Sequence, residues 1–192
     1  MEYSADYDID VNYPVLVDSI KHLYEQDING WYLELLDLKS ILPDFYNELE
    51  KQFDSEITVT RLFVTSYNTF STIHRDEAYK WALNIPITGC KGSYNVWYEL
   101  PKAVESIFSG KKDAEGVKFA ANNSGAKVYK LGEIGEAIHR VELNTPMIFN
   151  ADIPHNVITD RFGDGELRVV LSVRFKTGKT QTFKETCKQM GL

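Results

Sequence analysis

From residue 56 to residue 175 the chain is a succession of short strand-like segments separated by turn residues, and this pattern limits the possible fold most strongly. Little helical sequence lies between the segments, which argues against βαβ units. We therefore predict a mainly β fold with flanking helices, a jelly roll or double-sheet barrel. The segments are EITVTRLFVTSY, FSTIHR, KWALNIPIT, SYNVWYEL, KVYKL, IHRVEL, TPMIFNA, HNVITD and LRVVLSVRF.

Glycine-containing turns support the predicted hairpins. TGCKGS at 88–93 and DRFGDGE at 160–166 each offer glycines that can adopt the positive φ of tight connections. A longer connection at 101–126 is rich in Gly, Lys and Asn. We expect it to lie over one end of the barrel, as long loops at functional sites often do.

The ends of the chain read differently from this core. Residues 1–55 form a mixed segment, in which Phe45, Leu49 and Phe53 recur at helical spacing after Pro43 and predict a helix over 43–53. WYLELLDLKSI at 31–41 fits either a strand or a short helix. We expect 1–55 to pack on a jelly-roll core at 56–175, with 176–192 as a C-terminal tail, and residues 1–192 to form a single domain.

Composition excludes several classes of function. The net charge is −7 and the sequence pI is about 5.1, so a nucleic-acid partner is not expected. No apolar run is long enough to span a membrane, and no secretory leader begins the chain, so we expect a cytoplasmic protein. Cys90 and Cys187 are far apart and match neither a disulfide framework nor a zinc spacing.

Three residues have the chemistry of a metal site. His74 and Asp76 in the HRD stretch are two positions apart, so they lie on the same face of a strand. His155 follows the apolar run at 147–149 and is the expected third ligand; His139, which lacks that context, is the competing candidate. Two histidines and one carboxylate are the ligand set of non-haem iron(II) oxygenases, which leaves positions open for a co-substrate and dioxygen.

The last predicted strand carries two arginines on one face. Arg168, Val170, Ser172 and Arg174 alternate with apolar residues in LRVVLSVRF. An unpaired buried guanidinium is costly, so the pair predicts an anionic partner, and a dicarboxylate such as 2-oxoglutarate fits. Arg168 is suited to hold its distal carboxylate. Arg174 is a second candidate contact unless it reaches solvent or pairs with an acidic neighbour, and Ser172 is a third unless it only fills a small core position.

HRD, ALNIPI, PMIFNADIPHNV and RVVLSVRF, in this order over about residues 57–175, resemble the iron(II)- and 2-oxoglutarate-dependent oxygenase superfamily. The spacing of Arg168 and Arg174 is similar to that of its nucleic-acid dealkylase branch. This chain departs from that branch in its acidic charge and in lacking an Asn-x-Tyr stretch before the first ligand. The spacing from His155 to Arg168 is also slightly longer than usual, which a lengthened hairpin at 160–166 explains.

The resemblance implies a double-stranded β-helix, the cupin-like form of jelly roll, holding Fe(II) with 2-oxoglutarate as co-substrate. It implies that decarboxylation of 2-oxoglutarate with dioxygen is coupled to oxidation of a substrate C–H bond. Tyr67 and Asn84 are, by position, further candidate contacts to 2-oxoglutarate. Trp81 and Trp97 are candidates for the wall of a substrate pocket.

The leading hypothesis is therefore a 2-oxoglutarate-dependent dioxygenase that hydroxylates a small molecule or a protein side chain. A cupin-like metal enzyme that does not use 2-oxoglutarate is the first alternative, and it would have no need for Arg168. The second alternative is a non-catalytic binding module on the same barrel. The three intact ligands argue against this last possibility, and fold alone cannot separate the three hypotheses.

Overall fold

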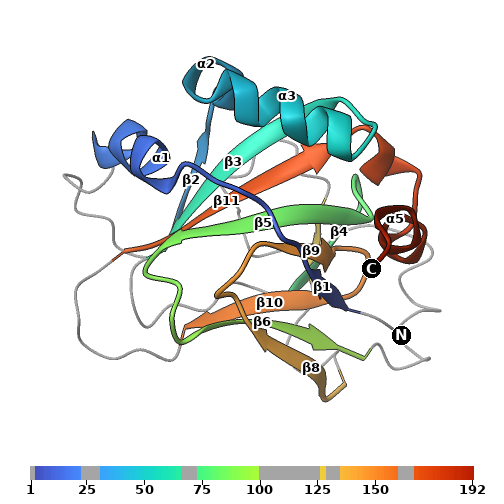
Figure 1. Ribbon diagram of the computed structural model, residues 1–192. Coiled ribbons are helices and arrows are strands. Elements are labelled where there is room, and N and C mark those ends of the chain that lie inside the picture. Colours follow the sequence, from blue (N-terminus) through green and yellow to red (C-terminus); the bar gives the residue numbers. More distant parts are fainter. Residues whose placement is uncertain (1–2, 23–30, 66–72, 100–125, 129–134, 160–166) are drawn as a thin grey trace.

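Two antiparallel sheets face each other in the computed structural model, which describes residues 3–22, 31–65, 73–99, 126–128, 135–159 and 167–192 (Figure 1). The larger sheet has the order β1-β9-β5-β11-β3-β2, and the smaller has the order β7-β4-β10-β6-β8. Successive strands alternate between the two sheets from β3 to β6 and again from β8 to β11, which is the topology of a double-stranded β-helix. The strands are β1 Ser4–Asp6, β2 Trp31–Leu35, β3 Ile57–Thr65, β4 His74–Asp76, β5 Trp81–Thr88, β6 Ser93–Tyr98, β7 Ala126–Val128, β8 Ala137–Glu142, β9 Met147–Asn150, β10 His155–Thr159 and β11 Arg168–Phe175.

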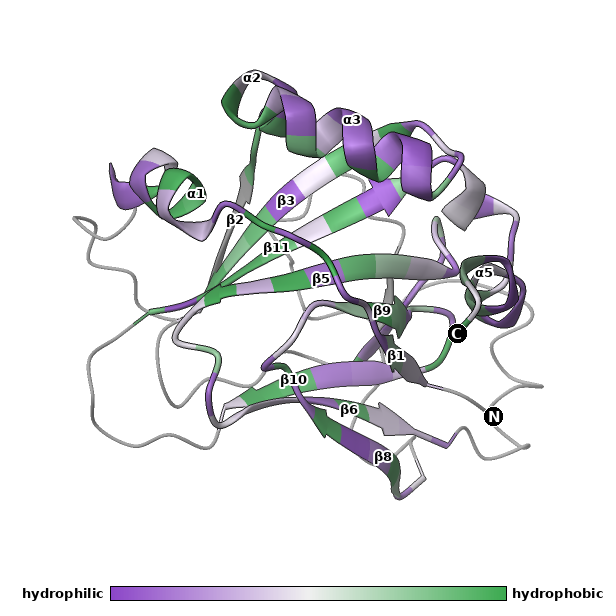
Figure 2. Cartoon of the chain, in the orientation of Figure 1, coloured by the Kyte–Doolittle hydropathy of each residue, from purple (hydrophilic) through white to green (hydrophobic). Residues whose placement is uncertain are grey.

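Helices cover the outer face of the larger sheet. They are α1 Tyr13–Ser19, α2 Leu38–Ile41 and α3 Pro43–Gln52, with η3 Thr177–Lys179 and α5 Phe183–Met190 after the last strand. Helix α3 begins at Pro43, whose fixed φ suits a first turn, and buries Leu49 completely. Figure 2 shows hydrophilic residues along α3 above strands that carry hydrophobic ones. The main apolar core lies between these helices and the sheet.

Strand β11 shows how the sheet separates this core from the interior between the sheets. All eight of its residues are buried. Val169, Leu171, Val173 and Phe175 belong to the helix-side core, whereas the alternate residues face the other way. Arg168 and Arg174 on that second face contact strands of the smaller sheet, β6 and β4. The period of two along one strand therefore delivers two cations into the interior.

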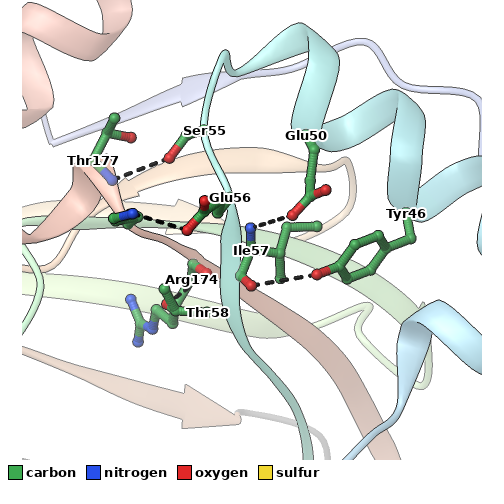
Figure 3. A network of polar contacts seen from close by, with 9 residues as sticks. Tyr46, Glu50, Ser55, Glu56, Ile57, Thr58, Arg174 and Thr177 are labelled. Carbon is green, nitrogen blue, oxygen red and sulfur yellow. Dashed lines mark hydrogen bonds and ion pairs between the residues drawn. The ribbon is translucent and has the colours of Figure 1, made fainter.

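A polar network fixes the start of β3 against its neighbours (Figure 3). The backbone N–H of Ile57 donates to Glu50 Oε1 of α3 at 2.8 Å. Thr58 Oγ1 donates to the carbonyl oxygen of Arg174 at 3.0 Å, and the backbone N–H of Thr177 donates to Ser55 Oγ at 3.0 Å. The carbonyl group of Arg174 is thereby bonded to β3, and the segment that follows β11 is bonded to Ser55, just before β3.

The strand predictions agree with this structure. Each of the nine predicted segments overlaps one of the strands β3 to β11, and the helix predicted over 43–53 is α3. The ambiguous stretch at 31–41 contains both a strand, β2, and a short helix, α2. Gly89 and Gly92 have φ of 61° and 73°, as the turn at 88–93 requires. The turn at 160–166 and nearly all of the loop at 101–126 lie outside the described residues.

The expected C-terminal tail contains a helix that was not predicted. Helix α5 begins with a capping box, in which Thr182 and Glu185 bond to each other's backbone N–H groups, and it ends at Gly191 with φ 74°. These caps were readable in the sequence as Thr-x-x-Glu followed by a glycine. Within the described residues, no helix combines the length and apolar character that a membrane crossing needs.

Candidate metal centre

Strands β4 and β10 bring the three predicted ligands together. The two strands are antiparallel, and His155 is the direct cross-strand partner of His74. One ligand atom from each of His74, Asp76 and His155 lies within 4.8 Å of the others. His74 Nε2 is 3.9 Å from Asp76 Oδ1, and the two imidazole rings are 4.5 Å apart between centroids. The arrangement follows from strand alternation on β4 and from the pairing of β4 with β10.

His155 is held as a neutral imidazole in one orientation. Its Nδ1 is 2.7 Å from the carbonyl oxygen of Ile153, so Nδ1–H donates there and Nε2 keeps its lone pair. The ring also packs edge-on against Phe149, with 4.6 Å between centroids. Burial lowers the pKa of His155 to about 3, with a further lowering by His74, while Asp76 opposes the shift. A neutral, oriented imidazole is the form that binds a metal.

Asp76 is kept ionised in a buried position. Burial alone would raise the pKa of its carboxyl group, but the Arg174 guanidinium and, to a smaller extent, His155, His74 and Arg61 hold that pKa below its usual range. Arg174 Nη2 lies 2.8 Å from Asp76 Oδ2. Arg174 thus pairs with an acidic neighbour, the alternative left open by the sequence, and its Nε and Nη1 are buried without a hydrogen-bond partner.

Arg168 lies at the other end of the same face of β11. It is only 4% exposed, and its Nε donates to Ser93 Oγ at 2.5 Å while Nη1 is 3.5 Å from Thr65 Oγ1. Burial lowers the pKa of its guanidinium, with Cys90 opposing the shift, because a charge removed from water is costly. In the described part of the chain no carboxylate pairs with it. An anion would satisfy this group.

Three further candidates for contact with 2-oxoglutarate have different outcomes. Ser172 and Asn84 are cross-strand partners on β11 and β5, on the face that carries Arg168, and Ser172 Oγ is buried without a partner. They therefore line the interior between the two arginines. Tyr67 lies outside the described residues.

The two tryptophans lie in different sheets and face different surroundings: Trp97 faces the interior between the sheets, and Trp81 faces the helices. Trp97 is the cross-strand partner of His155 and is fully buried in the interior, where its Nε1 donates to the carbonyl oxygen of Asn150 at 2.9 Å. Trp81 is equally buried but stacks on Phe53 and Phe175 in the helix-side core, with 5.5 and 5.3 Å between ring centroids. A pocket role for Trp81 is therefore corrected to a core role, because its position in β5 faces the helices.

One interior residue was not identified from the sequence. Arg61 is the cross-strand partner of Ser172 and shares the interior face of β3 with Phe63. The signal was present, because Arg61 alternates with Leu62 and Val64, which belong to the helix-side core. His139, the competing metal ligand, is separated from His155 by Trp97 in the pairing of β10, β6 and β8.

The donor set fits a divalent first-row metal. Two imidazoles and one carboxylate suit Fe(II), and the remaining coordination positions stay available for other ligands. The ligand atoms are close enough to share one ion, His155 offers a free Nε2 and Asp76 is ionised. No cysteine belongs to the cluster, so the softer thiolate sites are not matched.

Comparison with models of protein families finds no match, and no curated protein matches the sequence. Among solved structures, the fold is similar to E. coli ycfD (15% identity over 83% of this chain and 36% of that chain, TM-score 0.46). It is also similar to Lactobacillus farciminis oxalate decarboxylase (10% identity over 80% of this chain and 30% of that chain, TM-score 0.37). A third similar structure is a 2OG-Fe(II) oxygenase family oxidoreductase from Burkholderia pseudomallei (14% identity over 83% of this chain and 76% of that chain, TM-score 0.44). The chain spans about a third of the length of the first two.

Proposed function

We propose that the chain is an Fe(II)- and 2-oxoglutarate-dependent dioxygenase that hydroxylates a small molecule or a protein side chain. One observation carries the proposal: a His-Asp-His cluster faces the same interior as a buried arginine that pairs with no carboxylate among the described residues. The cluster supplies metal ligands, and the arginine supplies a site for the distal carboxylate of the co-substrate. Either feature alone would suit many kinds of site, whereas together they match both ends of 2-oxoglutarate.

His74, Asp76 and His155 would hold the metal. Bound Fe(II) supplies activation of dioxygen coupled to decarboxylation of 2-oxoglutarate to succinate and CO2. The protein keeps these ligands ready for binding. The carbonyl oxygen of Ile153 fixes the tautomer of His155, and Arg174 keeps Asp76 ionised and oriented.

Arg168 would bind the distal carboxylate of 2-oxoglutarate. The guanidinium is held in place by Ser93 and offers a planar set of donors that matches a carboxylate with two parallel hydrogen bonds. Its low exposure means that water competes weakly for the same donors.

An apolar stretch lies between the two polar ends of the interior. Val170 stands between Arg168 and Ser172 on β11, and it packs with Met147 and Leu143. The two methylene groups of 2-oxoglutarate lie between its distal carboxylate and its 2-oxo acid end. Along this face of β11, Arg168 is followed by the apolar Val170, then by the polar Ser172, and then by Arg174 beside Asp76. A guanidinium followed by an apolar side chain on the way to the metal site matches the order of the distal carboxylate and the methylene groups in the co-substrate.

The test is anaerobic titration of the metal-free protein with Fe(II) and then with 2-oxoglutarate, following the weak visible charge-transfer band of the chelated complex. The parent protein should develop the band. Arg168→Met should need about ten- to a hundredfold more 2-oxoglutarate, the loss expected for a charge-assisted pair. Arg140→Met is the matched control, because Arg140 is exposed on the outer face of β8 and stacks on Tyr94.

The outcomes separate the alternatives. Iron binding without the band at millimolar 2-oxoglutarate would favour a metal enzyme that does not use this co-substrate. A band that responds equally to Arg168→Met and Arg140→Met would remove Arg168 from the site. Failure to bind any divalent metal would contradict the proposal and leave a binding module on the same barrel.

A further inference from the structure

A third arginine faces the interior without an assigned task. Arg61 is half-buried on β3, and its Nε is buried without a hydrogen-bond partner. Within the described ranges, neither an ion pair nor a hydrogen bond joins its guanidinium to another side chain. Arg174 differs, since it pairs with Asp76, and Arg168 differs, since Ser93 holds it. The charge of Arg61 helps to keep Asp76 ionised, but its buried Nε stays without a hydrogen-bond partner in the described structure.

Arg61 belongs to a polar row that crosses the larger sheet. Ser172 is its cross-strand partner on β11, and Asn84 is the partner of Ser172 on β5. The row presents a guanidinium, a hydroxyl and an amide side by side, and Ser172 Oγ is also buried without a partner. These are the donors that bind carboxylates in proteins. Ser172 is two residues from Arg174 on the same face of β11. The row therefore lies close to Asp76, the candidate metal ligand that Arg174 contacts.

The charges of the interior favour a further anion. Among the interior residues of β3, β4 and β11, three guanidinium groups stand against one carboxylate, Asp76. A divalent metal would add two positive charges, and 2-oxoglutarate would bring two negative ones. These groups together would therefore keep an excess of about two positive charges, which is costly at low dielectric and favours a further anionic group beside them.

We infer that Arg61, with Ser172 and Asn84, forms a subsite for a carboxylate of the substrate, so that the enzyme acts on an anionic organic molecule or residue. This inference rests on the proposed function. Arg61 is a specificity-determining residue: it places the anionic end of the substrate beside the metal centre and makes no contact with the distal end of 2-oxoglutarate. Arg61 is half-buried, whereas Arg168 is only 4% exposed.

The test uses a loaded but inactive protein. Zn(II), which the same ligands can bind but which does not activate dioxygen, is added with 2-oxoglutarate. N-acetyl-L-amino acids and the matching neutral amides are then titrated by calorimetry. We expect members of the acid series to bind and their amides to bind about ten- to a hundredfold more weakly. Arg61→Gln should remove this preference, Arg61→Lys should keep part of it, and neither should change the affinity for 2-oxoglutarate.

Several results would overturn the inference. Equal binding of acids and amides, no binding of any acid at millimolar concentration, or unchanged acid binding in Arg61→Gln would each exclude a carboxylate subsite. A loss of 2-oxoglutarate affinity in Arg61→Gln as large as in Arg168→Met would assign Arg61 to the co-substrate instead. Failure of the parent protein to bind Zn(II) or 2-oxoglutarate would instead overturn the proposed function and this inference with it. Circular dichroism of each variant checks that the fold is intact.

Discussion

Removing Arg174 tests whether the buried ion pair at the metal centre is needed to keep Asp76 in place. The side chains of Arg174 and Asp76 are only 7% and 14% exposed, and their closest atoms are 2.8 Å apart. Arg174→Met leaves a carboxylate buried without its partner. Breaking a buried pair in this way typically costs about 3–5 kcal/mol, because the remaining charge is neither hydrated nor compensated. For a domain of this size the expected fall in Tm is roughly 6–20 °C.

The structure supplies a control ion pair with nearly the same contact distance. Lys176 Nζ lies 2.9 Å from Glu56 Oε2, but these side chains are 66% and 70% exposed. Lys176→Met should change the unfolding free energy by less than about 1 kcal/mol, because water already screens that pair. The contrast between the two variants isolates burial, since the distances are nearly equal.

The assay is urea unfolding of the metal-free protein, followed by circular dichroism. Asp76→Asn and the double variant Arg174→Met with Asp76→Asn complete a cycle. The double variant should lose clearly less stability than the sum of the two single losses, because each single change leaves the other charge buried without its partner. Additive losses would refute the reasoning, since they would show that the two side chains do not compensate each other.

Three other predictions follow from the same structure. His155→Gln should lower the affinity for Zn(II), measured by calorimetry, more than a hundredfold, whereas His139→Gln should leave it unchanged because Trp97 separates His139 from the cluster. Trp81→Ala should cost about 3–5 kcal/mol in urea unfolding by opening a cavity in the helix-side core, with no change in 2-oxoglutarate affinity in the folded fraction. Burial raises the pKa of the Cys90 thiol, an effect that Arg168 opposes, so the thiol holds its proton to higher pH when folded than when unfolded. Alkylation of Cys90, mapped by mass spectrometry, should be slow at pH 8 and fast in urea, and stability should fall as pH rises above the ordinary thiol range.

The strands, and the placing of two candidate ligands on one face, were predictable because both depend on local spacing. Alternation over a few residues identified every strand from β3 to β11, and it placed His74 and Asp76 on one face. The joining of His155 to them needed the pairing of β10 with β4, which no local pattern reveals. In the sequence, the apolar run before His155 and the ligand set of non-haem iron(II) oxygenases were the grounds for choosing it. The short edge strand β1 was not predicted, because three residues carry too little periodicity.

The tryptophans show the limit of the same reasoning. Trp81 and Trp97 both lie in strands, and their neighbours are similarly apolar. Which face of a strand points to the helices depends on the register between strands and on where the helices pack. In β5 that face carries Trp81 with Leu83 and Ile85, whereas Trp97 in β6 faces the interior. A pattern that marks a position as buried cannot say on which side of a sheet it is buried.

The arginines of β11 could be recognised as a pair, but their tasks could not be separated before the smaller sheet was placed. Arg168 and Arg174 are six residues apart, so their Cα atoms lie roughly 20 Å apart along the strand. Both side chains extend to the smaller sheet, Arg168 to Ser93 and Arg174 to Asp76, and not toward each other. One anion therefore cannot satisfy both groups at once. Asp76 already compensates Arg174. Under the proposed function, the distal carboxylate of 2-oxoglutarate would therefore bind Arg168, and a second anionic ligand would bind Arg61.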